Sequence, residues 1–306
     1  MKPATEHPYR RATHHAVLAT LAMSGALALT PAAQADSTSD AMAAGLRDAA
    51  NRLMQSRAAN PLQLPLSISS SLSAGDVRAE SQGVIEVPFQ DLVQALADAE
   101  HWCQVLILHL NNKACRVTTA GVVPHIALKV ANRYDQPANE AYDIDFAYRS
   151  LAASATLLSV RLDSPSGPMG TSTFVIRLDA VPYGDRRTAL QLSYAYHLNA
   201  LASLAMDLYL STLGSGKVGF TVTGHRADGG NEYIAGVQGL AERNLMRYFL
   251  ALRAAALEPD GSTADAYARR LRLWFDATEG FPVQLHEIDR ATYLQQKLPL
   301  APRPKP

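Results

Sequence analysis

Apolar and polar residues alternate along the middle of the chain, from about Cys115 onward. A period of two is typical of strands in an antiparallel sheet that is covered on one face only. The apolar positions of the expected strands are Ile126, Leu128 and Val130; Tyr142, Ile144, Phe146 and Tyr148; Leu158, Val160 and Leu162; Phe174, Ile176, Leu178 and Ala180; Leu190, Leu192, Tyr194, Tyr196 and Leu198; and Val218, Phe220 and Val222. The pattern therefore predicts a sheet of about six strands with one buried face.

Segments on either side of these strands repeat apolar residues at helical spacing. The longest spans about residues 234–257, and its apolar stripe consists of Ala241, Leu245, Tyr248, Phe249, Leu252 and Ala256. Such a stripe can cover the apolar face of the sheet. Before the sheet, the pattern predicts a strand over 77–87 and a helix over 89–103 that begins after Pro88. Other expected segments are helices over 40–57, 202–213, 263–278 and 285–297, a polar connector over 60–71 and a loose tail over 299–306.

The first 35 residues have the layout of a secretory signal peptide. Three basic residues precede an uncharged apolar run over 16–29, and Ala33–Ala35 form a small-x-small cleavage site. The run is about 14 residues long, shorter than the roughly 20 that cross a bilayer. An uncleaved anchor helix is the alternative, but Pro31 stops the helix and the cleavage site follows at the right distance. We therefore expect a periplasmic or secreted chain that has no transmembrane segment after cleavage.

The composition excludes several classes of protein. Of the 306 residues, 28 are Lys or Arg, 28 are Asp or Glu, and 48% are hydrophobic. This balance excludes a disordered chain, a coiled coil and a basic nucleic-acid binder. Removal of residues 1–35 takes away three basic and one acidic side chain and leaves a net charge near −2. We therefore expect no nucleic acid and no strongly charged partner.

Cys103 and Cys115 are the two cysteines of the chain. In an exported protein a disulfide between them would persist, and it would close a loop of about 13 residues. The chain-entropy estimate for such a loop is roughly 3 kcal/mol of stabilisation. A metal site with His101 or His109 is the alternative, but it would lack a complete ligand set and familiar zinc spacing. We predict that the two cysteines are bonded.

The order of the expected elements resembles that of the START-like helix-grip (SRPBCC) superfamily. A strand, a helix that begins at a proline, a run of antiparallel strands and a long amphipathic helix follow one another over residues 77–257. Residues 84–98 are similar to the passage from the first strand to the first helix of those proteins. The segments 217–222, 242–248 and 274–279 look like an exported and largely uncharacterised bacterial branch.

The resemblance implies an α+β fold in which a curved antiparallel sheet grips a long helix near the C-terminus, with extra terminal helices. The helices after Pro259 depart from a minimal helix-grip domain. The expected divisions of the chain are a signal peptide (1–35), an N-terminal helix and connector (36–65), a START-like domain (66–258) and a C-terminal helical extension with a Pro-rich tail (259–306).

The resemblance also implies a pocket between sheet and helix that holds lipids, sterols or other apolar molecules. Four tyrosines of the apolar face favour a cavity, because buried hydroxyls need hydrogen-bond partners; they are Tyr142, Tyr148, Tyr194 and Tyr196. A bound amphipathic ligand is one source of partners. The backbone, a water molecule or polar residues of the helix are others, and these residues are Glu242, Arg243, Asn244 and Arg247.

The candidate ligand-binding residues are Tyr148, Tyr194, Tyr196, Phe220, Asn244, Arg247 and Tyr248. Asn244 or Arg247 could reach a ligand carboxylate or phosphate, and the guanidinium group of Arg247 could do so with two hydrogen bonds. We expect an exported binding or carrier protein for a hydrophobic or amphipathic, lipid-like molecule, with transient membrane contact left open.

An enzyme of the cyclase, dehydratase or hydrolase kind is the alternative, and it needs a general acid or base inside the cavity. Glu242, His197 and Tyr194 are the candidates. The histidines beyond residue 35 lack metal-ligand spacing, so we expect no metal and no cofactor; they are His101, His109, His125, His197, His225 and His286. Residues 214–217 end like a phosphate loop, but Val218 stands where Ser or Thr is needed. A third hypothesis is a filled core and a protein that acts through a surface partner.

Overall fold

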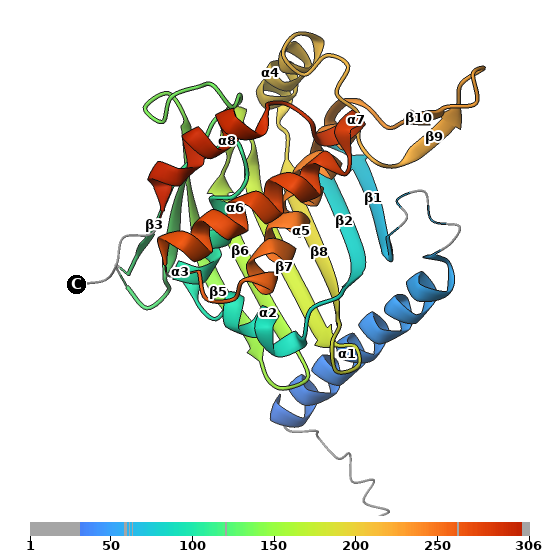
Figure 1. Ribbon diagram of the computed structural model, residues 1–306, viewed down its shortest axis with the longest axis vertical. Coiled ribbons are helices and arrows are strands. Elements are labelled where there is room, and N and C mark those ends of the chain that lie inside the picture. The colour runs from blue at the N-terminus through green and yellow to red at the C-terminus, as the bar shows by residue number, and fades with distance from the viewer. Residues whose placement is uncertain are drawn as a thin grey trace, which may run out of the picture. The chain divides into compact units, whose positions relative to one another are not determined.

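An antiparallel sheet of eight strands lies at the centre of the fold (Figure 1). The computed structural model describes residues 31–57, 60, 62, 64–119, 121–261 and 263–301, and residues 39–306 form one unit. The strand order is β1-β2-β8-β7-β6-β5-β4-β3, with every neighbouring pair antiparallel. The strands are β1 (Leu66–Ser73), β2 (Asp76–Ile85), β3 (Asn112–Thr118), β4 (His125–Val130), β5 (Tyr142–Ala153), β6 (Leu158–Ser166), β7 (Ser172–Pro182) and β8 (Thr188–His197).

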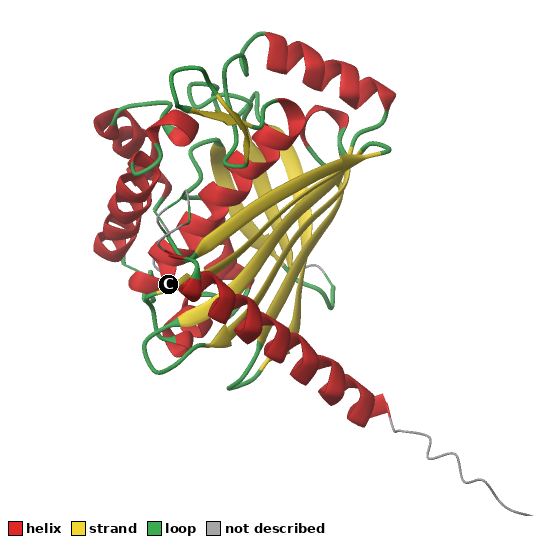
Figure 2. Ribbon diagram, turned by 90° about the vertical axis from the view of Figure 1, so that its right-hand side faces the viewer, coloured by secondary structure: helices red, strands yellow, loops and turns green. Residues whose placement is uncertain are grey.

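The alternation of the sequence sets which face of the sheet is buried. In β8, Leu190, Leu192, Tyr194 and Tyr196 are buried, whereas the residues between them from Gln191 to Ala195 are partly exposed. The inner face is therefore apolar and bends around the helices that cover it (Figure 2). This arrangement confirms the expected α+β fold with a curved antiparallel sheet.

Strand β1 was missed by the pattern, which predicted a polar connector there. The strand is rich in serine, so its sequence shows little alternation of apolar and polar residues. Only Leu66 is fully buried along the strand. A two-residue turn joins β1 to β2, with φ of 49° at Ala74 and 87° at Gly75. Positive φ at both central residues is what a tight hairpin with the right-handed twist of strands requires. The turn therefore pairs β1 with β2, and the strand order places β1 at the edge of the sheet.

The long helix α5 (Gly236–Leu257) lies on the inner face, as the apolar stripe predicts. A Cβ atom at Gly83 of β2 would lie 2.9 Å from the Phe249 ring, so the absence of a side chain lets α5 approach the sheet closely. The expected helix over 89–103 is two helices, α2 (Phe89–Ala95) and α3 (Ala99–Leu106). Asp98 separates them, because its side chain accepts a hydrogen bond from the His101 amide and caps α3.

The C-terminal extension packs on the outer side of α5. Helix α6 (Ala264–Glu279) begins after Thr263, whose side chain caps it. The expected helix over 285–297 is wrong in its first half, since α7 (Pro282–Leu285) and α8 (Arg290–Lys297) are separate. The ring of Tyr293 on α8 stacks on Trp274 of α6 at 5.0 Å between centroids. The short 3-10 helix η3 (Leu298–Leu300) follows, and residues 302–306 of the expected tail lie outside the described residues.

Helix α1 (Pro31–Gln55) packs on the outer face of the sheet through Ala43, Leu46 and Ala50. These residues contact outward-facing side chains such as Val181 of β7 and Ala189 of β8. The expected apolar run over 16–29 lies outside the described residues. None of the described helices has the length and apolar composition that crossing a bilayer requires.

Two further segments lie beyond the sheet, at the top of Figure 1. They are helix α4 (Ala200–Ser211) and a hairpin of β9 (Val222–His225) with β10 (Asn231–Tyr233). The strand expected over 218–222 is wrong, because residues 217–220 are irregular and only the end of the segment joins β9. The backbone amides of Phe220 and Thr221 donate to the Glu242 carboxylate of α5 instead of to a neighbouring strand.

Candidate functional site

A cavity of about 90 Å³ lies where the end of β8 faces α5. Its walls come from β4, β7, β8, α5, α4, the 3-10 helix η2 (Pro168–Gly170) and loops at residues 109–111, 131–132, 171, 217 and 287. Pockets for drug-sized ligands have about 300–1,000 Å³, and one water needs about 10–15 Å³ of such space. The cavity therefore has room for about six to nine waters, or for one small organic molecule of similar size.

Aromatic rings form the wall on the sheet side. The centroid of the Tyr194 ring lies 5.1 Å from that of Phe174 in an edge-on arrangement and 6.0 Å from that of Tyr248. Phe174 also stacks on Tyr196 at 5.4 Å. Alternation along β7 and β8 brings these residues to one face, and α5 adds Tyr248 from the opposite side. The result is an apolar surface with hydroxyl groups at its edge.

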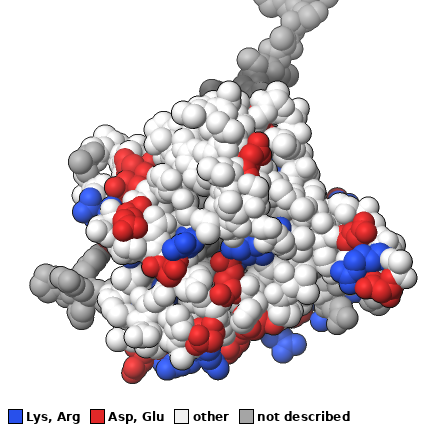
Figure 3. All heavy atoms as spheres, turned by 90° about the horizontal axis from the view of Figure 1, so that it is seen from above, with Lys and Arg blue, Asp and Glu red and all other residues white. Residues whose placement is uncertain are grey.

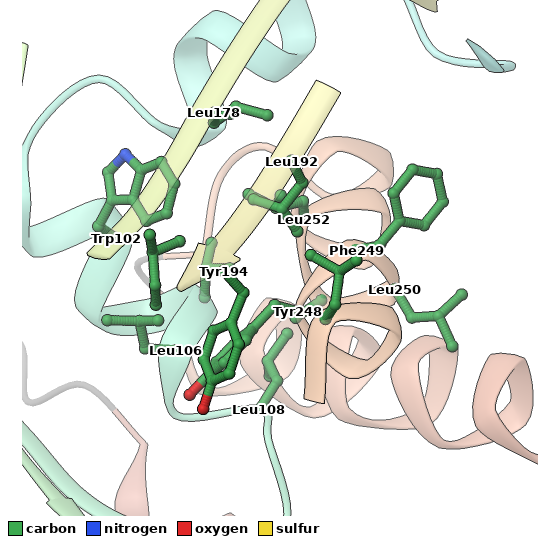
Figure 4. Close-up of a cluster of buried hydrophobic side chains, with 14 of the residues drawn as sticks. Trp102, Leu106, Leu108, Leu178, Leu192, Tyr194, Tyr248, Phe249, Leu250 and Leu252 are labelled. Atoms are coloured by element: carbon green, nitrogen blue, oxygen red, sulfur yellow. The ribbon is translucent and has the colours of Figure 1, made fainter. Parts of the chain in front are cut away.

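The hydroxyl ends of Tyr194 and Tyr248 lie next to one another (Figure 4). The Asn244 side-chain amide donates to the Tyr194 hydroxyl at 3.5 Å. Burial raises the pKa of Tyr194 well above its ordinary value and that of Tyr248 to about 12. Both groups therefore stay protonated at neutral pH and can donate a hydrogen bond to a ligand.

A cluster of charged groups forms the opposite wall. Arg243 and Arg247 lie one turn apart on α5, and both donate through Nη2 to Oε1 of Glu287 at 2.6 Å. The other carboxylate oxygen accepts from Lys217 Nζ at 3.1 Å. The two arginine side chains are 2% exposed. Three cations thus surround one carboxylate in a largely buried position.

Electrostatics within the cluster set the charge of each group. Burial would raise the pKa of Glu287, but the charges of Arg247, Lys217 and Arg243 lower it to about 2. Burial and the neighbouring Arg247 lower the pKa of Arg243 to about 10, and burial lowers that of Lys217. At neutral pH the carboxylate is therefore ionised and Arg243 is still charged.

His109 completes the polar lining at the turn between α3 and β3. Its Nδ1 accepts a hydrogen bond from the Asn111 amide at 3.2 Å, so its Nε2 donates to the Asn244 side-chain oxygen at 3.3 Å. Burial and the charges of Arg247 and Lys297 lower the pKa of His109 well below its ordinary value. The imidazole is neutral, and both ring nitrogens are engaged within the fold.

The structure brings together five of the residues expected to bind a ligand, namely Tyr194, Tyr196, Asn244, Arg247 and Tyr248. Tyr148 is buried on the same face but does not line the cavity. Phe220 lies elsewhere, with its ring 5.4 Å from that of Phe281. Tyr142, expected on the buried face, is 37% exposed at the start of β5.

The cavity also contains residues that the sequence did not single out as ligand-binding, namely His109, Lys217, Tyr209 and Glu287. Lys217 and Glu287 lie in irregular segments, which carry no periodic signal. A periodic signal does exist for the cavity residues of α5, because steps of one and four residues place them on one side of the helix. These residues are Arg243, Asn244, Arg247 and Tyr248.

Glu242 is fully buried but faces away from the cavity. Its carboxylate accepts hydrogen bonds from the amides of Phe220 and Thr221 at 2.7 and 2.9 Å and from the Ser70 hydroxyl at 2.7 Å. These contacts hold β1 and the segment before β9 against α5. His197, another candidate for acid or base catalysis, is partly exposed, and its Nδ1 lies 2.8 Å from Oδ1 of Asp76. Neither residue lines the cavity.

The disulfide between Cys103 and Cys115 is present and joins α3 to β3. The bond removes both thiols as metal ligands, and no group of three or more metal-ligating side chains lies close together among the described residues. Helix α8 holds the same turn from the other side. Lys297 Nζ donates hydrogen bonds to three backbone carbonyl oxygens, those of Ile107, His109 and Asn112. The Tyr293 hydroxyl donates to the backbone carbonyl oxygen of Leu108. His109 is thereby fixed at the cavity.

No family model matches the chain, and no curated protein matches its sequence. Solved structures with similarity include norcoclaurine synthase from Thalictrum flavum, with 12% identity, a TM-score of 0.33, and coverage of 47% of this chain and 90% of that chain. Human StAR-related lipid transfer protein 5 has 10% identity, a TM-score of 0.30, and coverage of 57% and 90%. The Zhui aromatase/cyclase from Streptomyces sp. R1128 has 15% identity, a TM-score of 0.31, and coverage of 45% and 85%.

At these TM-scores the likeness carries no argument, and the fold is described by its own elements, an eight-stranded antiparallel sheet with the long helix α5 on its inner face.

Proposed function

We propose that this chain is an exported binding or carrier protein for a small amphipathic molecule held between β8 and α5. The observation that carries the proposal is the cavity itself. One wall is aromatic and the other is polar, and tyrosine hydroxyls lie at the boundary. A molecule with an apolar body and a polar end would match both walls. Buried apolar side chains of the sheet and α5 surround the cavity in one core cluster.

The volume limits what can enter without a change in conformation. About 90 Å³ suits a small ring or a short chain, whereas an acyl chain or a sterol needs more room. Met206 and Tyr209 of α4 form one wall, so a lipid-like ligand would have to displace that helix. A small ligand requires no such movement, and we propose it as the simpler occupant.

Export is part of the proposal. The Cys103–Cys115 disulfide is of the kind that persists in an oxidising compartment, and the expected signal peptide (residues 1–35) would end within the first turns of α1. The expected transient contact with a membrane stays a prediction. Seen from the end at which α4 lies, the surface has areas without charged groups beside scattered acidic and basic side chains (Figure 3). Leu201, Leu204 and Leu208 of α4 are more than 60% exposed.

The enzyme alternative has less support. Glu242 is saturated by hydrogen bonds within the fold, His197 lies outside the cavity, and both nitrogens of His109 are engaged. Burial raises the pKa of Tyr194, so its hydroxyl does not act as a base at neutral pH. A general acid or base needs a pKa near the operating pH and an open path to the substrate.

Native mass spectrometry and organic extraction of protein purified without denaturant test the proposal. We expect a small organic molecule to copurify with the wild type and to be absent from Ala131→Met, because the longer side chain would fill the cavity that Ala131 lines. The control is Ala180→Met, which lies in the filled part of the core and should keep the molecule at a cost of about 1–3 kcal/mol.

A wild type that purifies empty, and whose melting temperature is unchanged by hexanoate, hexanamide, benzoate and benzamide, would contradict the proposal. If Ala131→Met retained as much of a copurified molecule as the wild type does, the binding site of that molecule would lie elsewhere. This result would also contradict the proposal that the cavity is the binding site.

A further inference from the structure

The charge balance of the cavity is incomplete. Its charged lining residues are Lys217, Arg243, Arg247 and Glu287, so three cations face one carboxylate. No other acidic side chain lines it among the residues that the structure describes. Positive charge held in a buried position is costly unless a counter-ion or hydrogen-bond acceptor accompanies it. The cavity therefore has an excess of positive charge on its polar wall.

Two hydrogen-bond donors of the arginine side chains also lack an acceptor. Nε of Arg243 and Nε of Arg247 are buried and have no hydrogen-bond partner within the described part of the chain. Both guanidinium groups instead converge through Nη2 on one atom, Oε1 of Glu287. A single carboxylate oxygen that serves two guanidinium groups leaves each arginine short of the paired contacts that the planar fork can make.

An apolar surface lies directly beside this cluster. Tyr248 follows Arg247 on α5, and its ring is 6.0 Å from that of Tyr194, which contacts Phe174 and Tyr196. A ligand that reaches the arginines from inside the cavity therefore places its remaining atoms against aromatic rings. This arrangement selects for a molecule with an acidic group at one end and a small apolar body at the other.

We propose that the ligand class is a small amphipathic carboxylate, bound with its acid group beside Arg243, Arg247 and Lys217 and its apolar part against Tyr194. This inference rests on the proposed function. A carboxylate is favoured over a phosphate because the same two guanidinium groups already bind one, that of Glu287, and because the cavity is small. The ligand adds a second acceptor to the cluster and brings its charge closer to balance.

A purely structural role for the cluster makes a different prediction. In that case Arg243 and Arg247 serve only to hold residues 285–287 against α5. Arg247 Nη2 also donates a hydrogen bond to the Leu285 carbonyl oxygen of that segment. Occupants of the cavity would then be chosen by shape alone. Acids and uncharged molecules of the same shape would bind equally well.

Isothermal titration calorimetry with matched pairs separates the two cases. Benzoate is compared with benzamide, and hexanoate with hexanamide, with inorganic phosphate as a further probe. We expect at least one acid to bind about tenfold more tightly than its amide, because charge-assisted hydrogen bonds to arginine are stronger than neutral ones.

Amides that bind as tightly as the acids would overturn the carboxylate assignment and leave the proposed binding function standing. Phosphate that binds more tightly than either acid would also overturn the assignment. Failure of all four organic probes would overturn both.

Substitution of the arginines localises the effect. In Arg247→Gln the preference for acid over amide should fall by about threefold or more, because one of the three cations beside the acid group is gone. Arg270→Gln is the matched control, because Arg270 is as deeply buried but contacts Gln104 and the Glu258 carbonyl, away from the cavity. This variant should keep the wild-type preference. If Arg247→Gln does not fold, the ratio measured on the wild type decides alone.

Discussion

At the scale of single residues, Glu287 connects three parts of the chain that are distant in sequence. It binds Arg243 and Arg247 of α5 on one oxygen and Lys217, from the segment after α4, on the other. Glu287 itself belongs to the C-terminal extension, between α7 and α8. The extension therefore contributes the only carboxylate among the described residues that line the cavity.

The ionisation of Glu287 should make stability depend on pH. Its ordinary pKa of 4.5 falls to about 2 in the folded chain because three cations surround it. A lowered pKa of an acid means that its stabilisation is present above pH 4.5 and is lost as the pH falls through 2. The shift corresponds to about 3 kcal/mol of unfolding free energy.

Urea unfolding of the wild type and of Glu287→Gln measures this contribution. We expect the variant to be less stable by about 3–5 kcal/mol at pH 7, since two buried arginines lose their partner. The difference should shrink between pH 4.5 and pH 2, where the wild-type carboxylate becomes neutral as well. A difference that stays constant across this range would show that the charge of Glu287 does not stabilise the fold.

The sequence predicted those site residues that lie on periodic elements. Tyr194 and Tyr196 follow from the alternation of β8, and Asn244, Arg247 and Tyr248 from the long helix. Phe220 was placed on a strand that begins only at Val222, because alternation over three apolar residues is too short to distinguish a strand from an irregular segment. Lys217 and Glu287 could not be found, since only the tertiary fold brings irregular segments together.

At the scale of elements, α4 has two different faces. Met206 is buried and lines the cavity, whereas Leu204 on the opposite side is 67% exposed. We expect Met206→Ala to lower the free energy of unfolding by about 2 kcal/mol or more, because buried apolar contacts are lost. Leu204→Ala should change it by less than about 0.5 kcal/mol.

Chemical denaturation of the two variants checks which face α4 turns toward the sheet. Equal losses in both, or a larger loss in Leu204→Ala, would mean that α4 packs differently from the arrangement described here.

The boundaries of elements were harder to predict than their existence. The helix over 89–103 divides because Asp98 caps a new helix, and a capping residue inside an apolar pattern is easily taken for a solvent-facing position. The segment over 285–297 divides because Asp289 caps α8 in the same way. Strand β1 was missed because a serine-rich edge strand buries few side chains.

At the scale of the whole molecule, the described residues from 39 onward combine an antiparallel sheet that curves around α5 with an extension that supports the cavity. Helix α8 and the Cys103–Cys115 disulfide hold the turn that carries His109, and the loop before α8 supplies Glu287. The sequence predicted the sheet, the long helix and the disulfide. It could not predict the size of the cavity between β8 and α5, because whether facing side chains meet or leave a space depends on their packing.

The central claim is that a small molecule binds between β8 and α5, and methionine methyl NMR tests it most directly. Met169 and Met206 line the cavity, whereas Met42 and Met54 lie on α1 at the outer face. With ¹³C-labelled methionine methyl groups, hexanoate or hexanamide should shift the signals of Met169 and Met206 and leave those of Met42 and Met54 in place. Shifts confined to Met42 and Met54, or no shift with either compound, would contradict the account.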